Sequence, residues 1–459
     1  MKPARGLTVA ILVAVCLGGG RGAFGQGGAR FSDRTLFVHF TSHEAAHSAR
    51  QVTPPLLAAI GARVEWASDI VPGLAVVRVE DPRMLDLAET LAGAQRDVEL
   101  VERDPLGRPT GVTPNDPKWP DQYGAQVTCF PGAWTVRTKS TVLIAVIGSG
   151  VAYTQPDLAG NMWFNSAEHG HDEDGSGIVG DYYGASFISD PTDHNYTPPN
   201  DPTDHEGHET GVASVLGAVG NNSDGMCGGA WQCTMFPVKI WGDRLVDSDA
   251  VKGMEYAINR GARLMNCSFT MGSTDSAAVR KFLQLTPEAL YVFAAGNDGI
   301  DLDGTAPPGG CHFQNYFPQQ YPFDNLLVVG GTSKTDGIWN DCAQIPACFC
   351  GGQATNYGAV SVDFLAPASH ILHLQVNPLL PNNPGTYHMD DGTSYAAPLT
   401  TAVAAMVWTE HPAWTPFQVK QWLMGTCDRL PQLAGSCVVG YPTAGGRLNA
   451  AAALGTSCN

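Results

Sequence analysis

The chain has 459 residues, of which 44% are hydrophobic and 15% are charged, and its formal net charge at pH 7 is -18. A single hydrophobic core stops growing near about 250 to 300 residues, so this length predicts one large domain and a smaller one. The acidic balance and the low share of charged residues make nucleic acids and anionic membrane surfaces poor candidates for partners.

The amino-terminal segment, residues 1–25, has the layout of a secretory signal peptide. Lys2 and Arg5 precede an apolar stretch from Leu7 to Leu17, and small residues follow it. That stretch is too short for a comfortable membrane span, although a retained signal anchor is the alternative. We therefore expect an exported protein, secreted or extracellular, with no stable membrane span once the signal is removed.

Cysteine usage fits export, because disulfides form in that pathway. One of the 12 cysteines lies in the signal segment, and the remaining 11 (12 minus 1) are an odd number, so at least one stays unpaired or pairs between chains. Cys267 lies in a strand-like run and is expected to be a buried free thiol. Two close pairs are predicted to form local disulfides: Cys227 with Cys233, and Cys427 with Cys437.

The pattern of elements predicts two domains. Residues 30–104 alternate strand-like and helix-like pieces in two strand-helix-strand units, which suit a small α+β sandwich. Residues 105–113 are rich in Pro and Gly and form a predicted linker. Residues 114–459 then form the large domain.

In the large domain, short β-branched runs alternate with helical patterns. One of these helices places Val251, Met254 and Ile258 on a single face. Strands that are apolar along their whole length, with helices between them, indicate a mostly parallel sheet covered on both faces, which is a three-layer α/β fold. Ligand chemistry in such folds lies at the carboxyl ends of the strands. The strand candidates are TVLIAVI, TMFPVKI, RLMNCSF, LYVFAA, NLLVVGG and VSVDFLAP.

Three segments hold side chains suited to acyl transfer. Ser394 lies at a Gly-Thr-Ser turn that opens an alanine-rich helix, where the helix amino end favours developing negative charge. His208 begins another helix of small residues, and Asn297 lies on a glycine turn after a strand. A hydroxyl nucleophile, an imidazole base and an amide that donates to an oxyanion are the groups that acyl transfer requires.

The motifs around these residues resemble those of the subtilisin family of serine proteases, from about Pro114 to the end of the chain. GTSYAAP is similar to the family's serine motif, AAGN to its oxyanion motif and GRLNAAAAL to its closing helix. The resemblance implies a three-layer subtilisin-like fold and serine endopeptidase activity, with Ser394 as nucleophile, His208 as base and Asn297 as oxyanion donor. It also implies that residues 30–104 are a propeptide-like domain, a folding chaperone and intramolecular inhibitor that would make the chain a zymogen.

The choice of histidine depends on spacing, since the run DHEGHETG contains both His205 and His208. The family's spacing to the following Gly-Asn-Asn fits His208, and His205 is expected to be a loop residue. A zinc site is a poor fit, because a helical zinc pair needs histidines at i and i+4, and residue 209 is Glu209.

Two positions depart from the family pattern. Gly148 stands where the family has the aspartate that orients the histidine, and Glu209 replaces the glycine that follows the histidine. Gly148 has no side chain that could fix the tautomer of His208 or stabilise its charged form. Glu209 is adjacent to His208 on the predicted helix, and helical neighbours one residue apart do not face each other, so we expect no rescue from it.

The expected consequence is strongly impaired hydrolysis. Loss of the corresponding aspartate in subtilisin lowers turnover by about 3 × 10⁴, although the serine, the histidine and the oxyanion donors still give weak catalysis. The alternative is a pseudoprotease that binds peptides or has a regulatory role. A third interpretation is a single-codon change of Asp to Gly at Gly148 in this sequence.

Two weaker signals concern a metal ion and the substrate. Asp172 and Asp174 lie in the run DEDGSG, which resembles an acidic calcium loop, although a solvated acidic turn fits as well. No cofactor is required for the chemistry, and calcium would be structural. The run NCSFTMG resembles the family's substrate-lining edge, so Ser268, Phe269 and Thr270 are expected to pair with an extended peptide, an ordinary sheet strand being the alternative.

Overall fold

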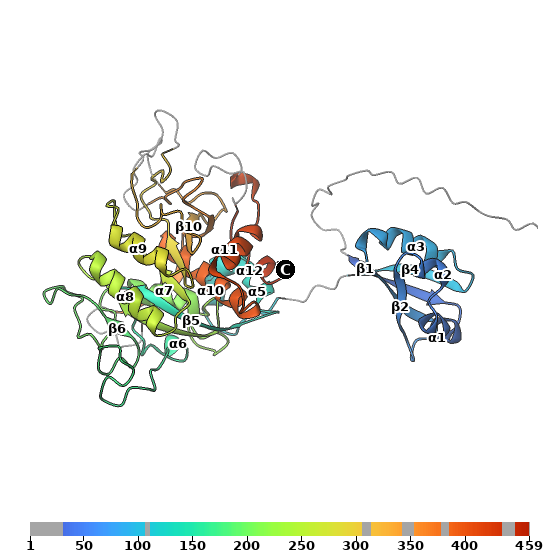
Figure 1. Ribbon diagram of the computed structural model, residues 1–459, viewed down its shortest axis with the longest axis horizontal. Helices are drawn as coiled ribbons and strands as arrows, with labels where there is room; N and C mark the ends of the chain where they lie inside the picture. Colours follow the sequence, from blue (N-terminus) through green and yellow to red (C-terminus); the bar gives the residue numbers. More distant parts are fainter. Residues whose placement is uncertain are drawn as a thin grey trace, which may run out of the picture. The chain divides into compact units, whose positions relative to one another are not determined.

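The computed structural model describes residues 31–105, 111–304, 314–341, 353–377, 385–433 and 446–458. The chain divides into two compact units, Met1–Arg108 and Pro109–Asn459 (Figure 1). The predicted signal segment, residues 1–25, lies outside the described residues. Within the described ranges, no helix is long and apolar enough to cross a membrane.

The first unit consists of one antiparallel sheet and the helices that pack on it. In chain order its elements are β1 (Phe31–Phe40), α1 (His43–Gln51), α2 (Pro55–Ala58), β2 (Ala62–Ala67), β3 (Leu74–Val79), the 3₁₀ turn η1 (Pro82–Met84), α3 (Leu85–Gly93) and β4 (Val98–Pro105). The strand order is β2-β3-β1-β4, and apart from the short α2 and η1 the elements follow the β-α-β-β-α-β order of ferredoxin-like domains. Leu36 and Val77 of the sheet share one core with Ala46 and Ala88 of the helices, which makes the unit an α+β sandwich.

The second unit is built on a parallel sheet. Its strands are β5 (Lys139–Gly148), β6 (Ala185–Ser186), β7 (Gln232–Lys239), β8 (Leu264–Cys267), β9 (Leu290–Ala294), β10 (Leu326–Thr332) and β11 (Phe364–Pro367). They form a seven-stranded sheet in the order β11-β10-β9-β8-β5-β7-β6, with every neighbouring pair parallel. All of the predicted strand candidates are in this sheet, and the predicted parallel α/β fold is confirmed.

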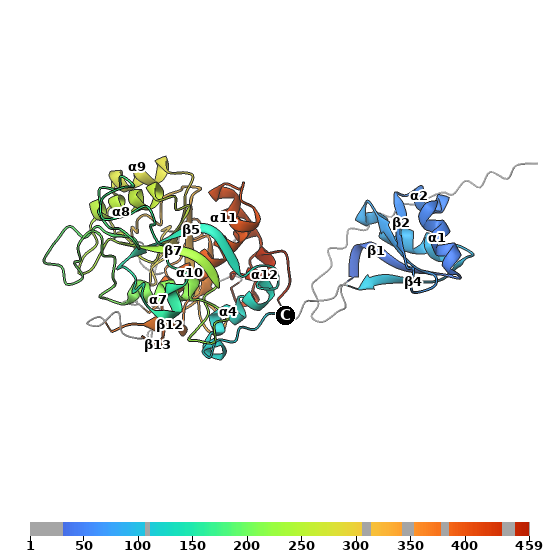
Figure 2. The same ribbon diagram turned by 90° about the horizontal axis from the view of Figure 1, so that it is seen from below.

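Helices cover both faces of this sheet. The remaining elements are η2 (Trp119–Asp121), α4 (Tyr123–Val127), α5 (Phe130–Ala133), α6 (Pro156–Ala159), α7 (His208–Gly217), α8 (Asp247–Asn259), α9 (Ala277–Leu285), the hairpin of β12 (Ile371–Gln375) and β13 (Thr386–Asp390), α10 (Thr393–Glu410), α11 (Pro416–Gly425), η3 (Pro431–Leu433) and α12 (Ala450–Ala453). Side chains of β5 alternate between two cores: Ile144 and Val146 pack with α7 and α10, whereas Ala145 and Ile147 pack with α8 and α9. Figure 2 shows α8 and α9 on one side of β5 and β7, and α7 on the other.

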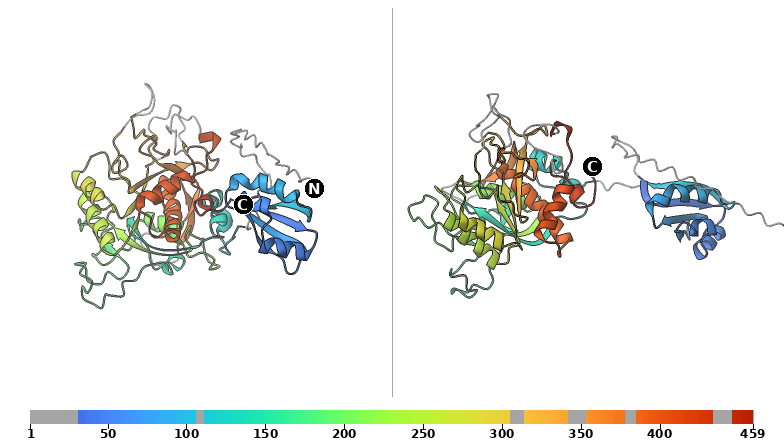
Figure 3. Two further views of the ribbon diagram at one scale, coloured as in Figure 1. Left: turned by 45° about the vertical axis from the view of Figure 1, so that its right-hand side comes forward. Right: turned by 45° about the horizontal axis from the view of Figure 1, so that its top comes forward.

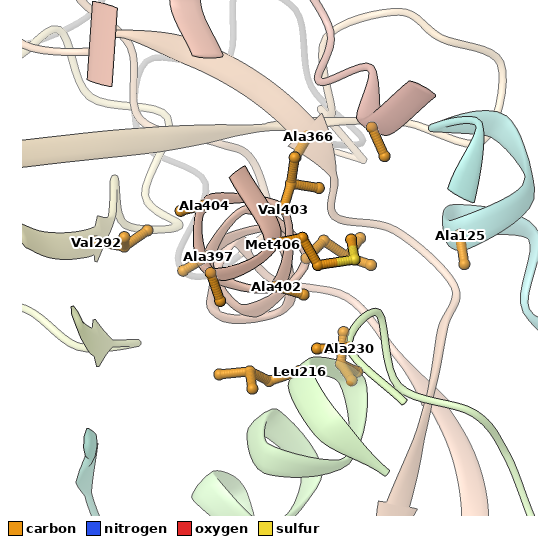
Figure 4. Packing of buried hydrophobic residues seen from close by; sticks show 14 of the residues in the cluster. Ala125, Leu216, Ala230, Val292, Ala366, Ala397, Ala402, Val403, Ala404 and Met406 are labelled. Atoms are coloured by element: carbon orange, nitrogen blue, oxygen red, sulfur yellow. The ribbon is translucent and has the colours of Figure 1, made fainter. Parts of the chain in front are cut away.

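Helix α10 lies inside the core. Residues 393–408 are all buried, and a helix that is apolar all round belongs in such a place. Small side chains such as Ala397, Ala402 and Ala404 let the strands and α7 pack close to its backbone, as the close view of Figure 4 shows. The same helix, orange to red, packs beside the sheet in both views of Figure 3. Its burial fixes the position of its first residues, which include Ser394.

The predicted disulfide between Cys227 and Cys233 is wrong, because both cysteines are buried and free. The backbone N–H of Cys227 donates to the side-chain amide oxygen of Gln122 at 3.0 Å. Cys233 belongs to strand β7, and its sulfur faces Gly217 at the end of α7. The thiol of Cys227 also donates to that oxygen of Gln122, at 3.5 Å, so the two sulfurs have different neighbours although the cysteines are close in the sequence.

Two other cysteines form a disulfide that the sequence does not predict. Cys129 and Cys458, 329 positions apart in the sequence, are bonded and join the start of α5 to the carboxyl-terminal segment. Cys267 is a buried free thiol, as predicted. Of the other predicted local pair, Cys437 lies outside the described residues.

Replacing Cys129 by Ser is expected to lower the free energy of unfolding by about 2 to 5 kcal/mol, since opening so long a loop increases the entropy of the unfolded chain. Guanidinium unfolding measures this loss. The matched variant Cys458→Ser should lose the same amount, and the double variant should lose no more than either single one. Additive losses in the double variant would contradict a bond between these two sulfurs.

Candidate active site

The predicted reactive residues meet where strands of the large sheet end. His208 is the first residue of α7, Ser394 is the second residue of α10, and Asn297 follows the end of β9. Helices α7 and α10 pack against each other in the core on one face of the sheet. The carboxyl edge of a parallel sheet is where such folds place their chemistry.

Ser394 is held at the amino end of the buried helix α10. Its side-chain hydroxyl donates to the carbonyl of Ser268 at 3.3 Å, and its own carbonyl accepts from the hydroxyl of Ser268 at 2.8 Å. That carbonyl would normally bond to the N–H four residues later, but the residue there is Pro398, which has none. Ser268 thus satisfies a carbonyl that the helix itself leaves open.

Asn297 is fixed beside Ser394 with its amide in one orientation. Its side-chain oxygen accepts hydrogen bonds from the backbone N–H of Thr393 at 2.9 Å and from the hydroxyl of Thr393 at 2.7 Å. Because a backbone N–H can only donate, the other end of the amide must be the NH₂ group. Among the described residues, none accepts a hydrogen bond from this Nδ2, which lies 3.5 Å from the place of a Cβ on Gly392. The site therefore offers an oriented amide donor next to the serine.

His208 is partly exposed, with 27% of its side chain accessible, and its Nδ1 lies 2.9 Å from Oε1 of Glu209. Its ring centroid is 6.4 Å from that of Tyr395, the residue after Ser394. Within the described part of the chain, no hydrogen bond joins His208 to Ser394. Hydrogen bonds of this kind are often long or misaligned in ligand-free sites and tighten when substrate binds.

The prediction that Glu209 would face away from His208 is wrong. The rule that neighbouring helical side chains diverge applies to groups that project from the helix surface. Glu209 is instead fully buried, and its carboxylate extends toward β5. A Cβ added to Gly148 would lie 2.1 Å from the carboxylate carbon of Glu209, so this carboxylate fills the space that a side chain on Gly148 would need.

The buried carboxylate of Glu209 has a second partner on strand β5. Its Oε2 accepts from the backbone N–H of Ser149 at 2.7 Å. The hydroxyl of Ser149 accepts from the N–H of Glu209 at 3.2 Å and donates to Asp204 at 3.0 Å. Asp204 in turn accepts from the backbone N–H groups of Gly207 and Thr210, at 2.8 and 3.1 Å. This network ties the first turn of α7 to the end of β5.

Acidic groups determine the protonation of His208. Burial raises the pKa of Asp204. Glu206 is exposed, and partial loss of hydration, followed by the charge of Glu209, raises the pKa of Glu206 to about 7. Burial by itself lowers the pKa of His208. The charge and the hydrogen bond of Glu209, followed by the charges of Glu206 and Asp204, outweigh burial and raise the pKa of His208 to about 9. The folded protein thus favours the imidazolium.

The residues predicted to bind substrate follow strand β8, which ends at Cys267. Ser268 and Phe269 are buried, and the ring of Phe269 packs against Phe293 with 5.7 Å between centroids. Thr270 is only partly buried, and its hydroxyl accepts from the backbone N–H of Gly272 at 3.1 Å. Ser268 contacts Ser394 directly, so this segment borders the reactive serine.

Asp172 and Asp174 lie with Glu168 in a group whose carboxylate oxygens are within 4.8 Å of one another. Glu168 is buried, and its Oε1 has no hydrogen-bond partner. Oxygen ligands of this kind suit calcium, and an unpartnered buried carboxylate oxygen fits a cation nearby. Asp174 also forms an ion pair with Arg260, so only part of its charge is available to a metal ion. The sequence analysis did not single out Glu168. The signal that could have found it is its acidic side chain, four positions before Asp172.

A serine hydroxyl, a histidine and an oriented amide at the carboxyl edge of a three-layer α/β fold define a serine hydrolase type of site. Residues 139–445 match the subtilase family, and this match spans more than half of the chain. The chain belongs to the subtilase family, which confirms the resemblance found in its motifs.

Relatives of this chain include proteases from a parasite and from bacteria. Subtilisin-like protease 1 of Plasmodium falciparum (isolate 3D7) is 26% identical over 306 residues, 63% of this chain and 40% of that protein. Thermitase of Thermoactinomyces vulgaris is 28% identical over 300 residues, 64% of this chain and 85% of thermitase. An extracellular protease of Xanthomonas campestris pv. campestris is 27% identical over 407 residues, 81% of this chain and 64% of that protein. The match thus spans less than half of the Plasmodium protein.

A solved structure also resembles the chain. It is described as one of the proteases from Pseudoalteromonas arctica PAMC 21717, and it aligns with a TM-score of 0.59 and 22% sequence identity. The alignment covers 75% of this chain and 99% of the other. This likeness concerns the fold, and it confirms the predicted subtilisin-like architecture.

We expect NMR titration of the His208 ring protons to give a pKa of about 9, above the ordinary value of about 6.5. A His208→Gln variant identifies the resonance. Because the folded-state pKa is raised, the stability that His208 contributes is fully present below pH ~6.5 and is lost as the pH rises through about 9. A midpoint at or below 6.5 would contradict the charge interaction with Glu209.

Proposed function

We propose that this protein is an exported serine endopeptidase that hydrolyses peptide bonds. The observation that carries the proposal is the grouping of Ser394, His208 and Asn297 at one edge of the sheet, on elements fixed by the core. Membership of the subtilase family supports it. A secreted location is supported by the signal-like residues 1–25 and by the relative named as an extracellular protease.

The reaction follows from the groups present. The Ser394 hydroxyl attacks the peptide carbonyl carbon while Nε2 of neutral His208 takes its proton, and the carbonyl oxygen becomes an oxyanion. The neutral form of His208 increases as the pH rises toward about 9, so this step is favoured at alkaline pH. Asn297 Nδ2 and the amino end of α10 stabilise that charge. His208 then gives the proton to the leaving amine, and a water molecule hydrolyses the resulting acyl-serine by the same route.

Measurable turnover is part of this proposal. The expectation of strongly impaired hydrolysis rests on the absence of a carboxylate beside the imidazole, and Glu209 Oε1 lies 2.9 Å from His208 Nδ1. This contact supports measurable turnover despite the absence of a side chain at Gly148. A pseudoprotease remains the outcome to be expected if the intact site hydrolyses nothing.

The substrate is proposed to be an extended peptide that pairs with the backbone after strand β8. Ser268 of this segment already contacts the reactive serine, and Thr270 is partly exposed. We further propose that residues 30–104, an α+β sandwich in the first unit, act as the intramolecular inhibitor and folding chaperone that the family resemblance implies.

We also propose a structural calcium site at Glu168, Asp172 and Asp174. The support is their mutual proximity and the unpartnered buried oxygen of Glu168. Calcium at this place would neutralise a group of negative charges and hold the loop around residues 165–181, with no part in the hydrolysis.

The Ser394→Ala variant tests the endopeptidase function. Hydrolysis of a fluorogenic peptide library by the parent protein should fall by about 10⁵-fold or more in the variant, because the acyl intermediate cannot form. A fluorophosphonate probe should label the parent and leave the variant unlabelled. Peptide hydrolysis that is equal in both proteins would contradict the proposal, as would a parent protein that neither reacts with the probe nor cleaves any peptide.

Calcium chelation tests the metal site. Adding EGTA should lower the Tm of the parent by about 2 °C or more, because a ligand bound only by the folded state stabilises it. The Glu168→Gln variant should lose most of this dependence, whereas Glu173→Gln, an exposed acid of the same loop, should keep it. A parent protein whose Tm does not respond to calcium or EGTA would contradict the site.

A further inference from the structure

Two positions that differ from the family pattern are complementary in space. Gly148 ends strand β5, and Glu209 is the second residue of α7. A Cβ on Gly148 would lie 2.1, 2.2 and 2.6 Å from Cδ, Oε1 and Cγ of Glu209. Real Cβ atoms do not approach other atoms so closely, and the backbone on both sides is buried. The glutamate can adopt this position only beside a glycine.

We propose that Glu209 is the positioning residue that replaces the strand-borne aspartate, so that the triad of this protein is Ser394, His208 and Glu209. The inference rests on the proposed endopeptidase function. The carboxylate carbon of Glu209 lies where a side chain on Gly148 would begin, so its oxygen contacts the imidazole from the side of β5. In the family pattern this carboxylate belongs to the strand, whereas here it belongs to the helix. In both cases it lies beside the imidazole.

The contacts of Glu209 give it the geometry that this role requires. Oε1 lies 2.9 Å from Nδ1 of His208, and Oε2 accepts from the N–H of Ser149 at 2.7 Å. With each oxygen bonded to a different group, the buried carboxylate has a fixed orientation. A carboxylate accepts hydrogen bonds, so it selects the tautomer with hydrogen on Nδ1, which leaves Nε2 as the proton acceptor. It also stabilises the imidazolium that forms when Ser394 attacks.

Other acids that are close to His208 in the sequence have hydrogen bonds elsewhere. Asp204 is fully buried and accepts from Ser149, Gly207 and Thr210. Asp201 accepts from Thr203 and Asp181 from Tyr256. None of these three acids has a hydrogen bond to the imidazole in the described part of the chain.

Glu206 is the remaining competitor, because its charge acts on His208 without a hydrogen bond between them. Lys239 of β7 is the buried cation of this region, and its ammonium group donates to the carbonyl of Thr203. The acids whose charges act on the imidazole are Glu209, Glu206 and Asp204. The titratable ring of Tyr395, on α10, also lies beside it, with 6.4 Å between centroids. Glu206→Gln removes a charge from the same segment and leaves the contact at Nδ1 in place, which makes it the matched control.

The first test compares Glu209→Gln with Glu206→Gln. Glu209→Gln should lower kcat by about 10⁴-fold with little change in KM, by analogy with loss of the triad carboxylate in other serine proteases. The acid limb of the kcat/KM profile should move to lower pH, because the charge that favours the imidazolium is gone. Glu206→Gln should keep kcat within about tenfold. Equal losses in the two variants, or an unmoved pH profile in Glu209→Gln, would overturn the assignment.

The second test returns the carboxylate to the strand. Glu209→Gly alone should be as inactive as Glu209→Gln, and the double variant Gly148→Asp/Glu209→Gly should recover at least about tenfold in kcat. Gly148→Asp alone should lower both activity and Tm, because the new side chain meets the Glu209 carboxylate. A role of Glu209 in folding alone predicts no such rescue, so failure of the double variant to exceed Glu209→Gly, with both folded, would overturn the proposal.

A readout independent of hydrolysis separates this inference from the proposed function. In Ser394→Ala protein, the NMR pKa of His208 should fall clearly below about 9 on Glu209→Gln, since the charge and the hydrogen bond that raise it most are removed. If the parent protein cleaves no peptide, the endopeptidase proposal fails, while this titration still shows whether Glu209 controls the imidazole. An unchanged pKa would overturn the role of Glu209 whatever the activity.

Discussion

The structure depends on one buried carboxylate between the imidazole and the sheet. Glu209 is fully buried, and an isolated carboxylate in such a place is costly unless it is paired and hydrogen-bonded. Its two oxygens meet that condition by contacting His208 and the backbone of Ser149. Those contacts fix the first turn of α7 against the end of β5, so the same interaction stabilises the fold at this point and orients the proposed base.

Much of the fold follows from local patterns in the sequence. The apolar runs predict the strands of the parallel sheet because each is buried on both faces and has no polar face to interrupt it. The three reactive residues could be found because each lies at a fixed offset from a helix start or a glycine turn; they are Ser394, His208 and Asn297. The strand ends bring those turns together. Glu209 could not be assigned in this way. Its orientation depends on the space left by Gly148 and on the N–H of the next residue, Ser149, which is 60 positions away in the sequence.

Long-range contacts account for the other errors. The bond between Cys129 and Cys458 joins the start of a helix to the far end of the chain, and spacing along the sequence gives no sign of it. Cys227 and Cys233 are close in the sequence, but the sulfur of Cys227 contacts Gln122, whereas that of Cys233 lies beside Gly217. Glu168 is a different case, because it lies only four positions before Asp172, and the burial that leaves its Oε1 without a hydrogen bond cannot be read from the sequence. For the cysteines, a partner distant in sequence, or the absence of one, determines the contact.

A side chain at position 148 and the carboxylate of Glu209 would occupy the same space. This conflict constrains how such a site could arise in evolution. On the proposed assignment, an ancestor with aspartate at position 148 and glycine at position 209 would reach this arrangement through two replacements. A glutamate introduced first would crowd the strand, whereas an aspartate lost first would leave no acid at the imidazole. The less damaging route would therefore pass through a feeble enzyme, and descendants should inherit both replacements as a pair.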